Sequence, residues 1–252
     1  MRMKKLKRIV LILVFLFFTI PIVKAQESSG GFSGLELSYG VKAGLVSSAF
    51  ASDFQKLETT ESRTSFSAGL FANVKITDLI GVSLEALYVQ EGTMRINSDY
   101  IYYDTRISSI DGLTIDRVNS NIIMHNIEVP LLVNLYLGNN DYNSRIFIGG
   151  SFDYIYNVYA KNLISYSGEG EAYVLSDRKK DVVSDSFKSY NIGAIIGAGI
   201  SYDMFTVDIR YKFGVMPIND LATFNYRNYY KEDFSTNVLM ISLGLNINEL
   251  LK

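Results

Sequence analysis

Hydrophobic and polar residues alternate along most of the chain after residue 35, with the period of two that is typical of a β-strand with two different faces. The clearest segment, 205–215, has Phe, Val, Ile, Tyr, Phe and Val at odd positions and Thr, Asp, Arg, Lys and Gly at even positions. Segment 239–247 repeats the pattern with aliphatic residues at every odd position. The pattern predicts eight strands, at 36–46, 65–76, 80–92, 120–138, 144–162, 189–201, 204–215 and 236–247.

The connections between these segments alternate in length. Short connections follow the second, fourth and sixth strands, whereas long polar segments at 47–64, 93–119, 163–188 and 216–235 follow the others. Outer-membrane barrels have this layout, with short turns in the periplasm and long loops outside the cell. The sequence therefore predicts an all-β fold, an eight-stranded antiparallel up-and-down transmembrane β-barrel that forms one domain over residues 26–252.

A soluble barrel of the lipocalin type would show the same period of two. The residue types on the two faces of each strand therefore decide between a soluble barrel and a membrane barrel. The polar face of segment 189–201 carries Asn191, Gly193, Gly197, Gly199 and Ser201, without any charge. Small residues suit the narrow interior of an eight-stranded barrel, and the apolar opposite face suits lipid. We therefore favour the membrane barrel.

The predicted inward face carries a nearly balanced set of basic and acidic residues. Because buried charges must pair, we expect a salt-bridged network that fills the lumen, and we regard a selective pore as the alternative. Pro130 lies within a strand that has no free edge, which predicts a β-bulge there. The predicted interior charge network consists of Lys42, Lys75, Glu85, Glu128, Arg145, Asp153, Asp208, Arg210 and Lys212.

Residues 1–25 have the layout of a cleaved signal peptide. A basic segment, 1–8, precedes the apolar run 9–20, and Val23 and Ala25 stand at the −3 and −1 positions of a cleavage site. The apolar run is too short for a spanning helix, which needs about 20 residues. We therefore expect export of the chain and residence in the bacterial outer membrane.

Composition excludes several classes of function. The net charge of −2 becomes more acidic without residues 1–25, since 18 basic and 26 acidic residues then remain, and this argues against a nucleic-acid partner. The chain has no cysteine and one histidine, which excludes thiolate and two-histidine metal sites. We expect no catalytic residues, no cofactor and no metal.

Two features could still carry an activity. The last long loop is rich in aromatic residues, which give large contact areas at low entropic cost, and could bind a partner or pack on itself. His125 could be the base of a lipid-modifying enzyme, but its expected exterior face offers no nucleophile and no orienting acid. The candidate contact residues of the loop are Phe224, Tyr226, Tyr229, Tyr230 and Phe234.

Several stretches of the chain form a recognisable set: Ala25-Gln26, Tyr39 to Leu45, Phe66 to Phe71, Ser83 to Tyr88 with Glu91-Gly92, Ile127 to Val133, Gly193 to Gly199, and Val207 to Tyr211. Together they resemble the PorT-like outer-membrane β-barrel family of Bacteroidetes. The resemblance extends over nearly the whole chain after residue 25. It implies a barrel and, through the founding member of the family, a role in type IX secretion.

We therefore expect a non-enzymatic barrel that is an accessory or scaffold of a cell-envelope assembly. Its expected partners are outer-membrane lipid and envelope or secretion proteins. The first alternative is a surface adhesion or ligand-binding barrel that acts through its long loops. The second is an outer-membrane lipid-modifying enzyme built around His125.

Overall fold

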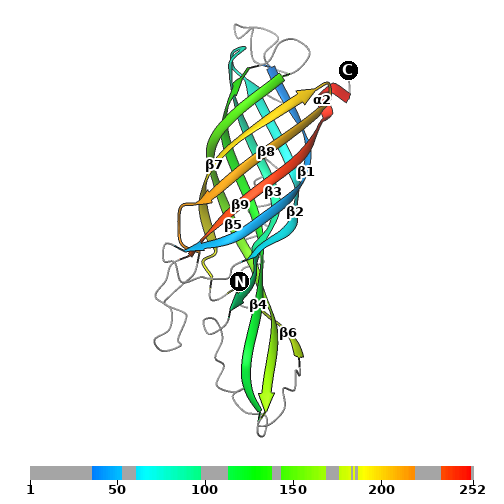
Figure 1. Cartoon of the computed structure of the whole chain (residues 1–252). Helices are drawn as coiled ribbons and strands as arrows, with labels where there is room; N and C mark the ends of the chain where they lie inside the picture. Colours follow the sequence, from blue (N-terminus) through cyan, green and yellow to red (C-terminus); the bar gives the residue numbers. More distant parts are fainter. Residues whose placement is uncertain are drawn as a thin grey trace.

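The protein is described from a computed structural model (Figure 1), which describes residues 36–52, 61–97, 113–137, 143–168, 176–182, 184, 187–218 and 234–250. Nearly all of these residues lie in β-strands. The strands are β1 Glu36–Ser52, β2 Glu61–Lys75, β3 Ile80–Asn97, β4 Leu113–Tyr136, β5 Asn143–Gly168, β6 Ser176–Val182, β7 Tyr190–Tyr202, β8 Phe205–Gly214 and β9 Phe234–Asn246.

Eight of the nine strands close into a barrel. Each strand pairs antiparallel with its neighbour in the order β1-β2-β3-β4-β5-β7-β8-β9, and β9 pairs with β1 to complete the ring. The ninth strand, β6, pairs with the outer part of β5 and with no other described strand. The predicted eight-stranded antiparallel barrel is therefore confirmed, and β6 is an addition to it.

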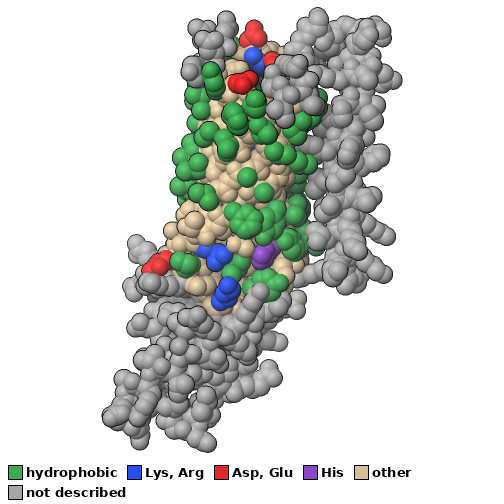
Figure 2. Space-filling view, turned by 90° about the vertical axis from the view of Figure 1, so that its right-hand side faces the viewer, with side chains coloured by type: hydrophobic (Ala, Val, Ile, Leu, Met, Phe, Trp, Pro, Cys, Tyr) green, Lys and Arg blue, Asp and Glu red, His purple; other side chains and the backbone are tan. Residues whose placement is uncertain are grey.

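The two faces of the wall have the predicted orientation. In β8 the side chains of Phe205, Val207 and Ile209 are about half exposed on the outside, whereas Asp208 and Arg210 are buried inside. Large exposed apolar side chains occur on most strands of the barrel, and Figure 2 shows them distributed over its wall. A soluble barrel would bury this face, so the apolar exterior is that of a barrel surrounded by lipid.

The two ends of the barrel differ. At the short-turn end, β2 joins β3 through residues 76–79 and β7 joins β8 through Asp203 and Met204. Asp203 adopts a φ of 51°, in the left-handed region that tight hairpin turns require. The four-residue helix α2, Ile247–Leu250, lies at the same end. Asn248 fixes α2 to β1, because its side chain accepts from the backbone nitrogen of Tyr39 and donates to the carbonyl of Leu37.

At the opposite, extended end, the outer parts of β4 and β5 project beyond the barrel together with β6 (Figure 1). Strand β4 has 24 residues and β5 has 26, whereas about 9–11 residues suffice to cross a bilayer. Residues 113–119 and 163–168 of these strands, together with β6, therefore form a sheet outside the barrel ring. The prediction that 93–119 and 163–188 are loops was wrong for these segments. Segment 177–181 is entirely charged, so its sequence shows no alternation of apolar and polar residues.

Pro130 is accommodated without the predicted bulge. It keeps its register with Ser151 of β5. On its other side the pairing of β3 with β4 stops at Leu84–Leu131 and resumes at Leu87–Glu128 in the same register. The missing N–H of proline thus removes ladder bonds but does not insert a residue, so the bulge prediction was wrong. The register instead shifts between His125 and Asn126.

No helix among the described residues is long and apolar enough to cross a membrane.

Candidate functional site

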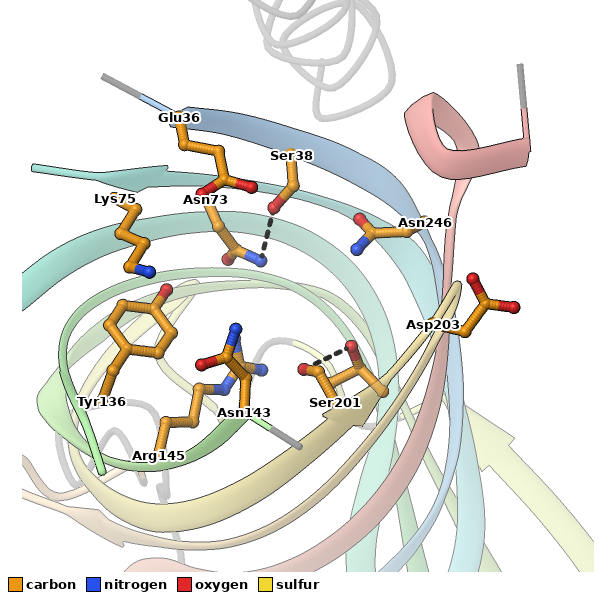
Figure 3. A pocket seen from close by; sticks show the side chains of 11 residues that line it. Glu36, Ser38, Asn73, Lys75, Tyr136, Asn143, Arg145, Ser201, Asp203 and Asn246 are labelled. Atoms are coloured by element: carbon orange, nitrogen blue, oxygen red, sulfur yellow. Dashed lines mark hydrogen bonds between the residues drawn. The ribbon is translucent and has the colours of Figure 1, made fainter. Parts of the chain in front are cut away.

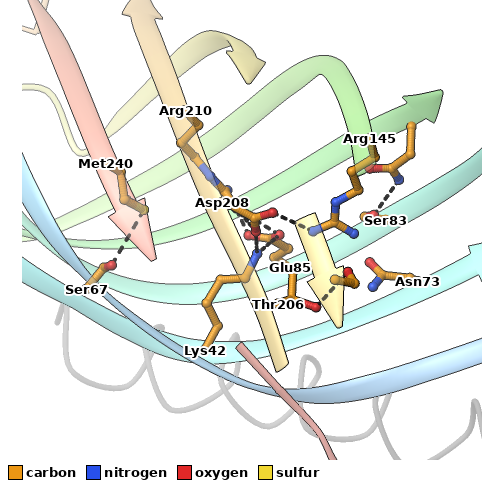
Figure 4. A network of polar contacts seen from close by, with 12 residues as sticks. Lys42, Ser67, Asn73, Ser83, Glu85, Arg145, Thr206, Asp208, Arg210 and Met240 are labelled. Atoms are coloured by element: carbon orange, nitrogen blue, oxygen red, sulfur yellow. Dashed lines mark hydrogen bonds and ion pairs between the residues drawn. The ribbon is translucent and has the colours of Figure 1, made fainter. Parts of the chain in front are cut away.

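The first candidate site is a group of ion pairs inside the barrel, which we call the inner network (Figure 4). The network is formed by Lys42 of β1, Glu85 of β3, Arg145 of β5, and Asp208 and Arg210 of β8. All five side chains are at most 5% exposed. Alternation places them inside, since each occupies the inward-facing parity of its strand.

The contacts of the inner network are short and mutual. Lys42 Nζ lies 2.6 Å from Glu85 Oε1 and 2.6 Å from Asp208 Oδ2. Arg210 donates two hydrogen bonds to Glu85, from Nη1 to Oε2 at 2.8 Å and from Nη2 to Oε1 at 3.0 Å. Arg145 Nη2 donates to Asp208 Oδ1 at 2.7 Å. Planar, two-point pairing of this kind is the strongest geometry that arginine offers to a carboxylate.

A second cluster, the Lys212 cluster, lies further toward the extended end. Lys212 Nζ donates to Glu91 of β3, to Glu128 of β4 at 2.7 Å and to Asp153 of β5 at 2.9 Å. Glu128 and Asp153 are cross-strand partners, which brings their carboxylates together. The three carboxylates present oxygens within 4.8 Å of one another, as ligands of a metal ion would. The ammonium of Lys212 contacts all three and supplies the cation.

The two clusters give the interior a charge gradient. The inner network has three cations and two carboxylates, whereas the Lys212 cluster has one cation and three carboxylates. The interior is therefore formally positive toward the short-turn end and negative toward the extended end.

Aromatic and aliphatic side chains occupy the space around the charges. The guanidinium groups of Arg145 and Arg210 lie 5.7 and 5.5 Å from the ring centre of Phe147. Gly197 makes room for this ring, since a Cβ at that position would lie 2.4 Å from Phe147 Cζ. Toward the extended end an apolar cluster, centred on Phe50, Ile122 and Met124, packs inside the barrel. Charged and apolar side chains therefore pack together in the interior of the barrel.

The structure places eight of the nine predicted network residues in these two buried clusters. Lys75 differs, because it lies near the rim of the short-turn end with a side chain 24% exposed, and it pairs at 3.9 Å with the fully exposed Asp78. The prediction missed Glu91, which is fully buried against Lys212. Glu91 shares the parity of Glu85, so alternation could have identified it, but it stands beside the expected end of its strand.

Of the five aromatic contact candidates, Phe234 lies among the described residues. Phe234 begins β9 and stacks on Phe50 with ring centres 4.9 Å apart, and it contacts Phe187 at 6.1 Å. It therefore packs against the apolar cluster of the extended end, where it is partly buried. Its role as a contact residue stays a prediction. Phe224, Tyr226, Tyr229 and Tyr230 lie outside the described residues.

His125 lies on the outer wall, on the face that the alternation predicts. Its Nδ1 lies 2.7 Å from the hydroxyl of Tyr88. The rings of Tyr156 and Tyr159 flank it with centres 5.9 and 5.5 Å away. Aromatic side chains with a polar tip are typical of the membrane–water interface, so the group has the composition of an interfacial cluster.

A closed barrel with an apolar exterior, a buried ion-paired interior and turns of unequal length defines an outer-membrane β-barrel protein. The family model described as "Outer membrane protein beta-barrel domain" matches residues 24–220. The chain belongs to this family. No curated protein sequence matches the chain significantly.

Solved structures of outer-membrane barrels are similar at low identity. Ail, the attachment invasion locus protein of Yersinia pestis, is 14% identical over 84% of this chain and 99% of its own, with a TM-score of 0.38. Neisserial surface protein A is 11% identical over 83% and 98%, with a TM-score of 0.39. The outer membrane protease OmpT from Escherichia coli is 10% identical over 87% and 99%, with a TM-score of 0.35.

Proposed function

We propose that the protein is a non-enzymatic accessory or scaffold of a cell-envelope assembly, exported by a signal peptide that is cleaved after Ala25. The PorT-like resemblance adds secretion as the process that the assembly serves. The observation that carries the proposal is the sheet formed by the outer parts of β4, β5 and β6 at the extended end.

Among the residues that the structure describes, this sheet has strand edges without a pairing strand. There β6 pairs with β5 alone, and the pairing between β3 and β4 ends at Asn97–Asn119. Open edges present rows of backbone donors and acceptors to which a further strand can add. A barrel needs neither the extra length nor the edges to cross the membrane, so both support a contact role outside it.

The test removes the outer part of β5 and most of β6 from this sheet and leaves the barrel ring unchanged. Lys161 and Lys180 are cross-strand partners, so joining them through an Asn-Gly turn in place of residues 162–179 closes a shorter hairpin. We expect this variant to fold in the outer membrane but to lose chemical cross-links to envelope proteins in its native cells. A variant with Lys75→Gln, at the opposite end, should keep the cross-links.

Each alternative function has a distinct signature in the same experiment. Retention of all cross-links in the shortened variant would contradict the scaffold role of the sheet. The adhesion alternative predicts that neither the wild-type protein nor the shortened variant forms cross-links to envelope proteins. It also predicts that the shortened variant loses binding to an external surface or glycan. Both readings use the extended end, so identification of the cross-linked molecule separates them.

A further inference from the structure

The buried charges inside the barrel do not balance. Among the described residues, four cationic and five acidic side chains are buried in the interior. The inner network holds three of the cations, whereas the Lys212 cluster holds three of the acids and one cation. Buried charges are costly unless they are compensated. The excess of one acid therefore calls for one further positive charge, and the Lys212 cluster is where it is missing.

The cavity at the short-turn end does not bring solvent cations to these acids. The cavity measures about 180 Å³, and Lys75, Tyr136 and Arg145 line one side of it (Figure 3). Arg145 belongs to the cation-rich inner network, and no residue of the Lys212 cluster lines the cavity. Toward the extended end, the apolar cluster around Phe50 packs inside the barrel. The three acids are therefore enclosed between the inner network and apolar side chains.

The same cluster also lacks a hydrogen-bond donor. Lys212 Nζ donates to one oxygen of each acid, on Glu91, Glu128 and Asp153. The second oxygens of Glu91 and Asp153, Oε2 and Oδ1, are buried and have no hydrogen-bond partner. Both atoms are acceptors, and burying an acceptor without a donor costs free energy. The cluster is therefore short of a donor as well as of a positive charge.

Asn126 contributes a third unpartnered acceptor, from a side chain that is not an acid. The side chain is 1% exposed, and its Oδ1 has no hydrogen-bond partner. On the inner face of β3 and β4 it lies between Glu91 and Glu128, in the cross-strand pair next to each. Both glutamates reach Lys212, so Asn126 lies on the wall of the cluster. Long side chains that are diagonal neighbours on one face of a sheet lie within reach of each other, which places Asn126 to accept from a neighbouring carboxyl group.

A proton fills this deficit better than a metal ion does. The ammonium of Lys212 contacts all three carboxylates and occupies the place that an ion among them would take. A proton on one carboxyl oxygen needs no further space, and it supplies both the missing charge and the missing donor. Carboxylates at short range share a proton in other proteins, because they cannot all ionise.

The register indicates which acid carries the proton. The cross-strand partner of Glu91 is Met124, which belongs to the apolar cluster of the extended end. Glu128 and Asp153 pair with each other, and the pairing of β3 with β4 places this pair nearer to Glu85 of the inner network. The excess positive charge of the inner network therefore stabilises these two carboxylates more than it stabilises the carboxylate of Glu91.

The charged surroundings of Glu91 come from three other strands. On β8, β4 and β5 they are Lys212, Glu128 and Asp153. On β2, Arg63 is half-buried and donates to Gln90 at 3.0 Å. The inward side chains that β1, β7 and β9 place near this level are uncharged, namely Ser48, Asn191 and Thr236. Lys212 is thus the cation that Glu91 shares with two other acids.

We propose that the folded barrel holds one proton on Glu91, whose Oε2 then becomes the missing donor of the Lys212 cluster. This proton brings the described buried charges into balance. An unfolded chain releases the proton above the ordinary titration of glutamate, at about pH 4.3, whereas the folded barrel keeps it. The stability of the barrel therefore falls as the pH rises above this value. The inference concerns the interior and goes beyond the scaffold function, which concerns the projecting sheet.

Infrared spectroscopy on the folded chain detects the proton directly. A protonated carboxylic acid has a C=O stretch separate from the carboxylate bands, and alkyl maltoside micelles contribute no carbonyl group. At neutral pH we expect this band in the wild-type chain, with a shift when the glutamate side chains are isotope-labelled. Glu91→Gln should abolish the band. Glu61→Gln, which changes an exposed carboxylate, should keep it.

Urea unfolding in lipid vesicles at a series of pH values measures the effect of the proton on stability. Above about pH 4.3, the unfolding equilibrium constant of the wild-type chain should rise about tenfold for each pH unit relative to that of Glu91→Gln, because one proton is released on unfolding. The rise should stop where the folded barrel loses the proton. Comparison with Glu91→Gln removes the contributions of other titrating groups, such as His125.

Several results would overturn the proposal. They are a wild-type spectrum without the protonated band at neutral pH, a band that persists in Glu91→Gln, and a band that shifts with labelled aspartate instead of labelled glutamate. Equal pH dependence of unfolding in the two chains would overturn it as well, and loss of stability on adding a chelator would show that a metal ion fills the deficit. The labelled wild-type chain keeps the test decisive if Glu91→Gln does not fold.

Discussion

Replacing Lys212 by methionine tests the ion pairing in the Lys212 cluster, where one cation faces three carboxylates. Methionine nearly matches the volume of the lysine side chain, so packing changes little while the ammonium is lost. Three fully buried carboxylates, on Glu91, Glu128 and Asp153, then lack the only cation of the Lys212 cluster. Removing one partner of a buried pair costs about 3–5 kcal/mol. We expect a loss at the upper part of this range.

The assay is urea unfolding of the barrel in lipid vesicles, followed by heat-modifiable migration on gels. Lys212→Met should lower the free energy of unfolding by about 3–5 kcal/mol. Adding Glu91→Gln should restore part of the loss, because Glu91 Oε2 is buried without a partner and its charge becomes dispensable. Lys75→Met is the control, since the pair of Lys75 with Asp78 is exposed and weak.

The stability of these variants shows whether the ammonium of Lys212 is needed to neutralise the three acids or whether its side chain only fills space. Unchanged stability of Lys212→Met would refute the view that the ammonium neutralises the three acids. A double variant less stable than the single variant would refute it as well, because it would show that Glu91 stabilises the barrel without Lys212.

Four further predictions use the same assays. Arg210→Ala should lower the free energy of unfolding in urea by about 3 kcal/mol, the low end of the cost of breaking a buried ion pair, because Lys42 still pairs with Glu85. An unshifted unfolding transition would refute the pairing of Arg210 with Glu85. Gly197→Leu should prevent folding in vesicles through its clash with Phe147, while Ala194→Leu on the outer face of the same strand should fold, and equal folding of the two would contradict the packing. His125→Ala should leave folding and membrane lipid composition unchanged by mass spectrometry, and a lipid modification lost with this variant alone would favour the enzyme alternative. Replacing Tyr226, Tyr229 and Tyr230 with Ser should keep heat-modifiable folding but weaken partner capture in pull-downs, and undiminished capture would remove this loop from the contact surface.

The barrel itself was predictable because lipid imposes a strict pattern on its wall. Where the strands have lipid on one side and packing on the other, alternation is regular, as in β8 and β9. The alternation of apolar and polar residues is lost in the segments that project beyond the barrel wall. Strand β6, with its run of five charged residues, and the outer parts of β4 and β5 could not be found in this way.

Parity identified the interior charges but not their partners. It placed Arg210 and Glu85 on inward faces, yet only the closed ring brings residues 125 positions apart into contact. It could not show that Lys75 lies too near the rim to join the inner network. The division of the interior into a positive and a negative cluster depends on register around the barrel, which sequence alternation leaves open.

A cysteine scan along β9 tests most directly whether the apolar face contacts lipid. The chain has no cysteine, so single substitutions at residues 238–243 can be labelled with a fluorophore in the otherwise unchanged protein. Lipid-borne quenchers should quench labels at Leu239, Ile241 and Leu243, which are exposed, and spare labels at Val238, Met240 and Ser242, which are buried. Quenching that alternates with the opposite phase, or that does not alternate, would contradict the inside–outside assignment on which the charge network and the membrane barrel depend.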